Sequence, residues 1–426
     1  MKTIVLFALL LCFCEVSNSQ SWIQSYAVNN SSFTDIHFLN TNTGYCSSSY
    51  SGGFIGYGGV IKSTDGGSNW VGVYNGVPIQ SIYFINDNTG WIAGGYWDDM
   101  GRKSREIFKT TNGGQNFTRQ FLDSLSYLFK AIQFINQDVG FVLTRNGILY
   151  TSNSGNNWIT RNLPADNSGA MFFVNQFTGY VSGYLSGSQT NLYKTTNAGS
   201  NWTTEALDGT VADIFFANES TGWVISNAGK IYKTTDGWNS RTSMDLSLSN
   251  ISSIFFYGAS TGWICGGNGQ MYYTNNGGAN WTLQNTGTSS GLHHLFFTDS
   301  NTGWVLGGQY VSPVLIIASI HKTTNGGISA INSISSEVPA GYSLSQNYPN
   351  PFNPSTNFEF RIADFGFVNL TIYDAMGRIV KTLQNGNMKP GVYQAQWNAA
   401  EYPSGVYFYR LSAEGFTDTR KMILTK

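Results

Sequence analysis

The run Ile82-Tyr83-Phe84, followed at Gly90-Trp91 by a glycine and an aromatic residue, is the pattern that decides the fold. An apolar and aromatic strand leads into a turn, and the glycine-aromatic step opens the next strand. Seven copies occur, and their glycines are 46, 50, 39, 43, 40 and 41 residues apart. The copies run from Ile36-His37-Phe38 to Gly44-Tyr45, Ile82-Tyr83-Phe84 to Gly90-Trp91, Ile132-Gln133-Phe134 to Gly140-Phe141, Met171-Phe172-Phe173 to Gly179-Tyr180, Ile214-Phe215-Phe216 to Gly222-Trp223, Ile254-Phe255-Phe256 to Gly262-Trp263, and Leu295-Phe296-Phe297 to Gly303-Trp304. This period suits a four-stranded propeller blade, so the sequence predicts a seven-bladed β-propeller over residues 20–329.

A second repeated element is a turn with the pattern Ser/Thr-x-Asp/Asn-x-Gly-x-x-Trp/Phe, complete in residues 63–70. The Asp or Asn side chain can accept hydrogen bonds from backbone N–H groups in the turn, and glycine takes the positive-φ position at little cost. The key positions are Asp65 with Trp70, Asn112 with Phe117, Asn153 with Trp158, Asn197 with Trp202, Asp236, Asn276 with Trp281, and Asn325. Two copies are degenerate, because Arg241 and Ala330 stand at the closing aromatic position after Asp236 and Asn325.

The ends of this array predict how the ring closes. The seventh turn lacks its aromatic strand, while an orphan strand, residues 21–26, precedes the first repeat. That strand begins Ser21-Trp22-Ile23 and resembles the strand after a complete turn, such as the one that begins Trp70-Val71. We therefore expect it to be the outermost strand of blade seven, which pairs an otherwise exposed edge.

Composition agrees with many short strands joined by tight turns. Of 426 residues 49 are glycine, 15% are aromatic and only 11% are charged, which argues against helix bundles and charged disordered tails. The net charge of −1 disfavours nucleic acid as a partner.

The first 19 residues have the pattern of a secretory signal peptide. Lys2 precedes an apolar run, Ile4–Cys14, which is too short for a typical membrane span. Small residues before the bond between Ser19 and Gln20 predict cleavage there. No other long apolar stretch follows, so we do not expect the mature chain to span a membrane.

Cysteine and histidine give little support for a cofactor or metal site. The mature chain keeps Cys46 and Cys265, which could pair in an oxidising compartment or lie as two buried thiols in separate repeats. The histidines show no HExxH or other metal-ligand spacing. We therefore expect no cofactor and no metal.

A different pattern begins after Ser329. Residues 330–342 read as a Ser-rich linker, and three prolines within Pro349–Pro354 then force an extended lead-in. Six alternating strands separated by turn signals predict a small Ig-like antiparallel β-sandwich over residues 343–426. The predicted strands are 357–362, 368–374, 379–383, 392–397, 406–411 and 419–424.

Both regions resemble known families. The turns resemble the Asp-box, or BNR repeat, of sialidases, and the array from about Trp22 to Ser329 is similar to the propellers of the photosystem II assembly factor family and of xyloglucanase-type proteins. Residues 343–426 contain several characteristic stretches: Tyr348-Pro349-Asn350-Pro351-Phe352-Asn353-Pro354, Leu370-Thr371-Ile372-Tyr373-Asp374 with Gly377-Arg378, Ser404-Gly405-Val406-Tyr407-Phe408-Tyr409, Arg420-Lys421 and Lys426. On these residues the region resembles the type A C-terminal sorting domain of type IX secretion cargo.

The second resemblance implies a cellular address. It implies a Gram-negative bacterium, Sec export to the periplasm, and passage through the outer-membrane translocon. A sortase would then remove the sorting domain, with release or surface anchoring of a propeller that we expect to be monomeric.

A catalytic constellation is not evident in the sequence. Asp98-Asp99 is the single adjacent carboxylate pair, and neighbouring side chains on a strand point to opposite faces. No sialidase-type arginine segment or phosphate-binding loop occurs in the required context. We expect a binding or scaffold protein, and the alternative is a secreted glycan-active hydrolase of the sialidase or xyloglucanase type. A carboxylate pair at the mouth of the central channel would favour the hydrolase, and a channel lined by small and apolar groups would favour the binding module.

The lengths of the repeats suggest a ligand face. Extra residues fall between the second and third strands of blades one, two, four and seven, and such loops all emerge on one face of a propeller. Exposed aromatic residues beside polar groups suit a glycan or protein ligand, although they could instead pack the insertions onto the rim. The candidate residues are Tyr50, Phe54, Tyr57, Tyr96, Trp97, Asp98, Tyr184 and Tyr310.

Overall fold

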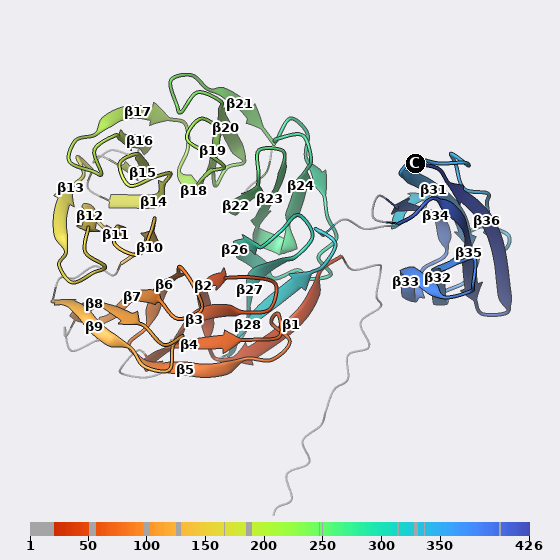
Figure 1. The fold of residues 1–426 in the computed structure, drawn as a ribbon, viewed down its shortest axis with the longest axis horizontal. Coiled ribbons are helices and arrows are strands. Elements are labelled where there is room, and N and C mark those ends of the chain that lie inside the picture. The colour runs from red at the N-terminus through yellow and green to blue at the C-terminus, as the bar shows by residue number, and fades with distance from the viewer. Residues whose placement is uncertain are drawn as a thin grey trace, which may run out of the picture. The chain divides into compact units, whose positions relative to one another are not determined.

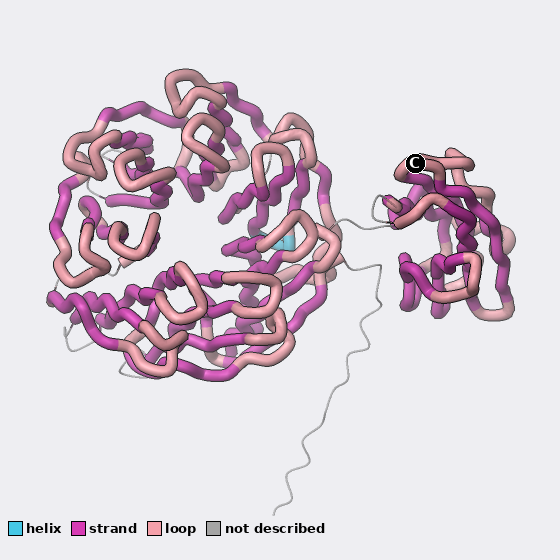
Figure 2. Tube along the Cα trace, in the orientation of Figure 1, coloured by secondary structure: helices cyan, strands magenta, loops and turns pink. Residues whose placement is uncertain are grey.

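The structure, a computed structural model, describes residues 21–50, 57–97, 103–124, 129–165, 167–184, 190–246, 248, 250–312, 315–327, 331–335, 337–399 and 402–426. The predicted signal segment and its cleavage site, Ser19 and Gln20, lie outside these residues. The described chain falls into two compact units, Ser21–Ile328 and Ser329–Lys426. It is built from strands and turns, with one short helical turn, η1 (Gly267–Gly269), in its described part (Figure 2). No helix in the described residues is long and apolar enough to cross a membrane.

The first unit consists of seven four-stranded antiparallel sheets arranged in a ring, which confirms the predicted seven-bladed propeller (Figure 1). In each blade the chain starts at the innermost strand and works outward. Blade one contains β2 (Ser32–Phe38), β3 (Gly44–Tyr50), β4 (Tyr57–Ser63) and β5 (Val71–Gly76), and blade two contains β6 (Ile79–Phe84), β7 (Gly90–Trp97), β8 (Lys103–Thr110) and β9 (Thr118–Asp123). Blade three contains β10 (Ala131–Phe134), β11 (Gly140–Thr144), β12 (Gly147–Thr151) and β13 (Ile159–Asn162), and blade four contains β14 (Asn167–Phe173), β15 (Gly179–Tyr184), β16 (Thr190–Thr195) and β17 (Thr203–Leu207). Blade five contains β18 (Val211–Phe216), β19 (Gly222–Ser226), β20 (Lys230–Thr234) and β21 (Thr242–Asp245), and blade six contains β22 (Ile251–Tyr257), β23 (Thr261–Gly266), β24 (Met271–Thr274) and β25 (Thr282–Leu283).

Blade seven confirms the predicted closure. It contains β26 (Gly291–Phe297), β27 (Gly303–Ser312) and β28 (Leu315–Thr323), and its fourth strand is β1 (Ile23–Asn29), the first strand of the described chain. β1 pairs antiparallel with β28, from Ile23 opposite Lys322 to Asn29 opposite Ile317. Trp22 also supplies the aromatic ring that the seventh turn lacks. Its fully buried indole meets Phe297 edge-on at 5.7 Å, as Trp70 meets Phe38 at 5.9 Å in blade one.

Neighbouring blades are joined by one aromatic stack that repeats around the whole ring. The aromatic residue of each glycine-aromatic step lies flat on the last phenylalanine of the innermost strand in the next blade. All seven pairs have centroids 3.5–4.1 Å apart and planes within 13° of parallel. The pairs are Tyr45–Phe84, Trp91–Phe134, Phe141–Phe173, Tyr180–Phe216, Trp223–Phe256, Trp263–Phe297 and, across the closing seam, Trp304–Phe38. Stacking and burial of these rings therefore hold each blade to the next.

The glycine of the step is required by the same stack. A Cβ atom added at Gly222 would lie 2.3 Å from the ring of Phe216 in its own blade, and the other six glycines meet their own phenylalanines at 2.3–2.5 Å. Each phenylalanine thus lies against a glycine of its own blade while it stacks on an aromatic residue of the preceding blade. This contact explains why the glycine and the aromatic residues recur together.

We predict that Gly222→Ala lowers the free energy of unfolding by about 1–3 kcal/mol, because the added methyl group must displace a buried ring that is already packed. Gly72→Ala is the matched control, since a Cβ there meets no atom within 4 Å. We expect its effect to stay within about 0.5 kcal/mol. Urea denaturation of both variants measures the difference, and equal stabilities would contradict this role of the glycine.

The second unit is the predicted antiparallel sandwich. Its two sheets have the strand orders β29-β34-β31-β30 and β33-β32-β35-β36. Phe358, Phe360, Ile372, Tyr409 and Leu411 are fully buried in the core that both sheets share. The strands are β29 (Ile331–Ser335), β30 (Ser343–Leu344), β31 (Ser355–Ile362), β32 (Gly366–Asp374), β33 (Ile379–Met388), β34 (Gly391–Asn398), β35 (Gly405–Ala413) and β36 (Phe416–Leu424).

Residues 331–335 depart from the prediction of a linker over 330–342. They form β29, which pairs with β34, and Ile331 is 4% exposed within the sandwich core. The segment alternates poorly between apolar and polar residues, so its pairing with a strand some 60 residues later is what makes it a strand.

Candidate functional site

The Asp-box turns are structural hairpins in all seven blades. The hydroxyl of the leading Ser or Thr accepts a hydrogen bond from the backbone N–H four residues later, at 2.8–3.0 Å in every copy. The carboxylate of Asp65 accepts a bond from the N–H of Asn69, and five other boxes repeat this bond. The box side chains are therefore committed to their own turns.

The fifth box keeps its aromatic ring at a different place in the turn. Trp238 occupies the position of the second glycine with φ of 73°, and its indole is 8% exposed against Tyr180 and Phe216. Its Nε1 donates to Glu205 at 2.6 Å, while Arg241 at the closing position lies over the same indole. Although the fifth box lacks an aromatic residue at its closing position, the indole of Trp238 thus supplies an aromatic ring to that box.

The boxes also bind the preceding blade. In five blades the stacked Trp or Tyr donates to a box carbonyl of the next blade, at 2.7–3.2 Å. Tyr45, for example, donates to the Gly113 carbonyl, and Trp304 donates to the Gly66 carbonyl across the closing seam. We call this end of the ring, with the seven boxes, the box face.

The opposite end of the ring, which we call the insertion face, carries the connections between the second and third strands. Four of these contain residues outside the described part, namely 51–56, 98–102, 185–189 and 313–314, in blades one, two, four and seven as the repeat lengths predict. Phe54 and Asp98 lie among them. Tyr50, Tyr57, Trp97 and Tyr310 lie at the strand ends that border them, and Tyr96 and Tyr184 are partly buried there. The backbone thus brings the candidate residues in the described part of the chain to one face, and ligand binding by them remains a prediction.

A second candidate site lies on the innermost strands, at a position that the sequence analysis did not single out. In six blades the pairing register of the innermost strand shifts just before this position or across it. The position stands three residues before the stacked phenylalanine. Its occupants, from blade one to blade seven, are Asp35, Ser81, Ala131, Ala170, Asp213, Ser253 and His294. Alignment of the seven copies on that phenylalanine would have revealed two carboxylates and a histidine in one ring.

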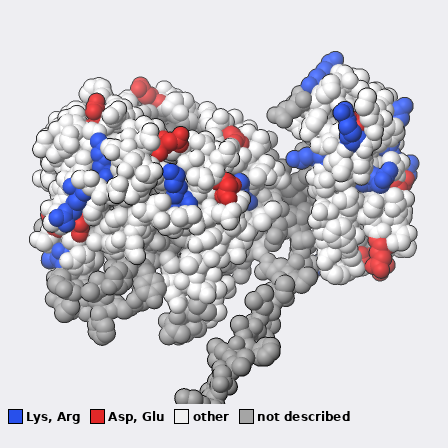
Figure 3. All heavy atoms as spheres, turned by 60° about the horizontal axis from the view of Figure 1, so that its bottom comes forward, with Lys and Arg blue, Asp and Glu red and all other residues white. Residues whose placement is uncertain are grey.

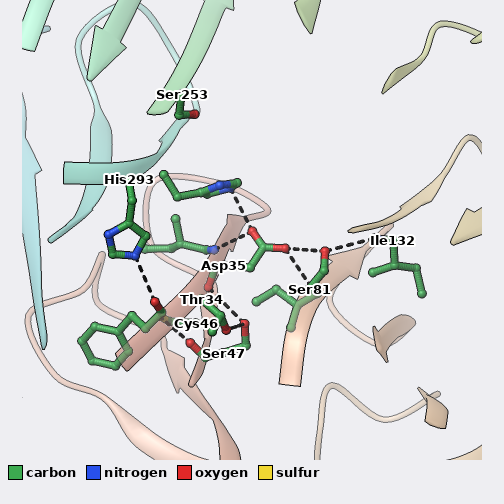
Figure 4. A network of polar contacts seen from close by, with 12 residues as sticks. Thr34, Asp35, Cys46, Ser47, Ser81, Ile132, Ser253 and His293 are labelled. Carbon is green, nitrogen blue, oxygen red and sulfur yellow. Dashed lines mark hydrogen bonds and ion pairs between the residues drawn. The ribbon is translucent and has the colours of Figure 1, made fainter. Parts of the chain in front are cut away.

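Asp35 is the centre of a polar network that joins blades seven, one, two and three (Figure 4). One carboxylate oxygen accepts from Ser81 Oγ at 2.6 Å and from Ile82 N at 2.9 Å, both in blade two. The other contacts His294 Nε2 of blade seven at 2.9 Å. Ser81 Oγ in turn accepts from Ile132 N of blade three at 3.1 Å.

This contact shifts both pKa values. Burial alone would raise the pKa of Asp35, but the contact with His294 and the hydrogen bonds from Ser81 and Ile82 lower this pKa below its usual value. Burial also opposes protonation of His294, but Asp35, and to a lesser extent Asp213, raise its pKa. The contact thus joins blade seven to blade one, and each of the two groups favours the charged form of the other.

Asp213 repeats this arrangement in blade five without the histidine. It accepts from Ser253 Oγ at 2.9 Å and Ile254 N at 3.0 Å in blade six, and from Ile214 N at 2.8 Å. Burial raises the pKa of this carboxyl, and none of the described cationic side chains forms an ion pair with it.

The next ring, one residue before the stacked phenylalanine, is almost entirely aromatic. Tyr83, His37, Phe296, Phe255, Phe215 and Phe172 form a chain of neighbours with centroids 4.8–5.7 Å apart. Gln133 holds the seventh position, where its amide bonds to the backbone of Phe173. Burial lowers the pKa of His37 to about 4, so this imidazole is neutral at pH 7.

The innermost strands match in full neither the carboxylate pair expected of a hydrolase nor the small and apolar lining expected of a binding module. The innermost strands carry two carboxylates as well as small and apolar residues, but both carboxylates are engaged by N–H groups and serine hydroxyls. In the described residues, no three His, Cys, Asp or Glu side chains are grouped so that they could hold a metal ion. Cys46 and Cys265 are free and buried in blades one and six, and burial raises the pKa of both thiols.

We predict that acid destabilises the propeller partly through His37. The unfolded imidazole binds a proton below pH about 6.5, whereas the folded one does so only near pH 4, so stability falls as pH falls through this window. His37→Phe should make the decline of the free energy of unfolding shallower by up to about 1.4 kcal/mol per pH unit between pH 6 and 4.5. Urea titrations across this range measure the slope. The control Phe255→Tyr should leave it unchanged, and an unaltered slope in His37→Phe would refute the assignment.

Comparisons with known proteins agree with these two units. The family model described as the photosynthesis system II assembly factor YCF48 matches residues 79–212 and 124–240, and that of the secretion system C-terminal sorting domain matches residues 346–425. Among solved structures, "YCF48 bound to D1 peptide" is 18% identical with a TM-score of 0.51, covering 71% of this chain and 98% of that one.

Two further structures share the propeller. YCF48 from Cyanidioschyzon merolae is 17% identical with a TM-score of 0.53, covering 70% of this chain and 98% of that one. The WD40 propeller domain of Doa1 is 12% identical with a TM-score of 0.51, covering 70% and 96%. At these identities the likeness shows the fold alone. No curated protein matches the chain.

Proposed function

We propose that this chain, which carries a YCF48-type propeller followed by a type IX secretion sorting domain, is an exported binding protein. Its propeller holds a protein ligand on the insertion face. The observation that carries this proposal is the asymmetry of the ring. The box face is committed to hydrogen bonds within and between blades, whereas four connections of variable length converge on the opposite face. Loops held by a rigid scaffold are where binding residues concentrate.

A peptide is the ligand class that we favour over a glycan. A YCF48 propeller, similar in fold to this one, has been solved with a D1 peptide bound. On the side of the propeller that Figure 3 shows, acidic and basic side chains are scattered over a largely uncharged surface, which suits a ligand recognised by aromatic and polar groups.

The hydrolase alternative has less support. Asp35 accepts three hydrogen bonds besides its contact with His294, and Asp213 accepts three. Glycosidases instead need one carboxyl group free to protonate the leaving group and a second free to act on sugar or water. We propose that these two carboxylates tie blades together and that the protein has no hydrolytic activity.

The sorting domain indicates secretion or a cell-surface location. We propose that the chain crosses the periplasm, leaves through the type IX translocon, and loses residues of the sandwich to a sortase at the outer surface.

Deletion of Ser329–Lys426 should leave a folded propeller trapped in the periplasm, because the propeller and the signal for export across the outer membrane are separate compact units. Fractionation of producing cells followed by immunoblotting locates the truncated chain. An inert carrier fused to residues 329–426 is the reciprocal control and should reach the surface. Normal surface delivery of the truncated chain would contradict the assignment.

Tyr96→Ala together with Trp97→Ala should weaken ligand binding by about 2 kcal/mol if these aromatics are anchors, while the melting temperature hardly changes. Arrays of peptides and glycans, probed with the full mature chain, identify the ligand and measure the loss. Trp70→Ala in the first box is the control. It removes a half-buried indole that packs on Phe38, so it should cost up to about 3 kcal/mol of stability and leave affinity unchanged. A folded Trp70 variant that lost binding while the double variant kept it would place the site on the box face.

A further inference from the structure

A polar hollow of about 380 Å³ lies on the outer side of the ring, where β17 of blade four meets β20 and β21 of blade five (Figure 1). Its volume falls within the range of ligand pockets, although its lining is polar where most pockets are largely apolar. The hollow therefore suits a small polar ligand. The lining residues are Asp208, Lys230, Tyr232, Arg241, Thr242 and Ser243.

The hollow lies where blade five departs from the repeat. At the closing position of the box, blade one carries the half-buried indole of Trp70, whereas blade five carries Arg241. Trp238 supplies the ring of box five from within the turn, where it is 8% exposed, so no closing indole covers the outer surface beside β21. Its φ of 73° is a left-handed conformation that tryptophan rarely adopts, and such unusual backbone conformations cluster at functional sites.

Two ion pairs hold the charged side chains of the hollow in place. Lys230 Nζ lies 2.5 Å from Asp208 Oδ2, and Arg241 pairs with Glu205 on β17. The charged groups of Lys230 and Arg241 also lie 5.4 and 5.6 Å from the ring centroid of Tyr232, which is buried. The side chains of the two cations are 30% and 28% exposed, whereas that of Asp208 is 81% exposed. These four charges cancel, so the group is polar and has no net charge.

We propose that this hollow binds a neutral sugar, a pyranose unit with hydroxyl groups on neighbouring ring carbons. Each sugar hydroxyl both donates and accepts hydrogen bonds, so adjacent hydroxyls can bond to the carboxylate of Asp208 and the ammonium group of Lys230 together. Ser243 and Thr242 add hydroxyl groups, and the guanidinium of Arg241 adds N–H donors. An anion is a poorer fit because it would be repelled by the exposed carboxylate of Asp208, and an apolar ligand would desolvate these polar groups without bonding to them.

The test uses small sugars whose methyl group stands in for the rest of a glycan. The methyl α-pyranosides of glucose, galactose and mannose are each titrated into the full mature chain at pH 7 and followed by saturation-transfer NMR. The control compound is 2-(hydroxymethyl)tetrahydropyran, which has the same ring without neighbouring hydroxyl groups. We expect at least one glycoside to bind at millimolar concentration, about fivefold or more tightly than the control compound, because hydrogen bonds to charged groups are the strong ones.

Two variants locate the sugar. Lys230→Met keeps the length of the side chain and removes its donors, and Ser243→Phe fills the hollow from an exposed position opposite Tyr232 in the pairing of β20 with β21. Each should weaken binding about fivefold or more. Lys233→Met is the matched control, because this lysine of β20 points to the opposite face of the blade, over Trp223 at 5.5 Å, and it should have no effect. Thermal melts confirm that each variant is folded, and one that unfolds is replaced by Arg241→Met.

Absence of binding by all three glycosides, equal binding of the control compound, or unchanged affinity in folded Lys230→Met and Ser243→Phe would overturn the inference. The inference is independent of the proposed function, since the hollow lies on the outer side of the ring and the proposed peptide lies on the insertion face. Loss of peptide binding in the Tyr96 and Trp97 double variant, with glycoside binding unchanged, is the result expected if both proposals hold.

Discussion

The stack of one aromatic ring on the phenylalanine of the next blade is the interaction on which the rest of this propeller depends. It occurs seven times with nearly the same geometry, and the seventh pair, Trp304–Phe38, joins the last blade to the first. Each stack fixes two further features: a glycine that leaves room for the ring, and in five blades a hydrogen bond from the stacked residue to the next box. A single repeated contact therefore joins each blade to the next, requires the glycine beside it, and connects the last blade to the first.

This constraint also decides where function can reside. Changes on the box face disturb blade contacts, whereas the connections on the insertion face differ in length between blades while the stacks keep nearly the same geometry. The innermost strands lie between these extremes. Their carboxylates and serines tie adjacent blades together, and their aromatic residues one position before the stacked phenylalanine are partly exposed.

Much of this arrangement could be predicted from the sequence, because it is written in local, repeated patterns. The period of the glycine-aromatic step gives the blade number, and the orphan strand at Trp22 gives the closure. Features that depend on contacts between distant residues could not be read in the same way. β29 is a strand because it pairs with β34, and Trp238 replaces a closing aromatic residue by reaching the same space from another position in the turn. Asp35, Asp213 and His294 lie in separate blades, so their grouping in one ring depends on the tertiary structure. Alignment of the repeats on the stacked phenylalanine would have indicated that they share one position.

Closure is the most direct test of the account, since a ring held by seven equivalent stacks needs its last blade complete. The measurement is the melting temperature of the chain without Trp22–Tyr26, compared with that of a chain without residues 337–341, a segment between β29 and β30 that contains no strand. The account predicts a melting temperature several degrees lower for the first deletion, because it removes a buried indole and uncovers the edge of β28. Equal melting temperatures for the two chains would contradict it.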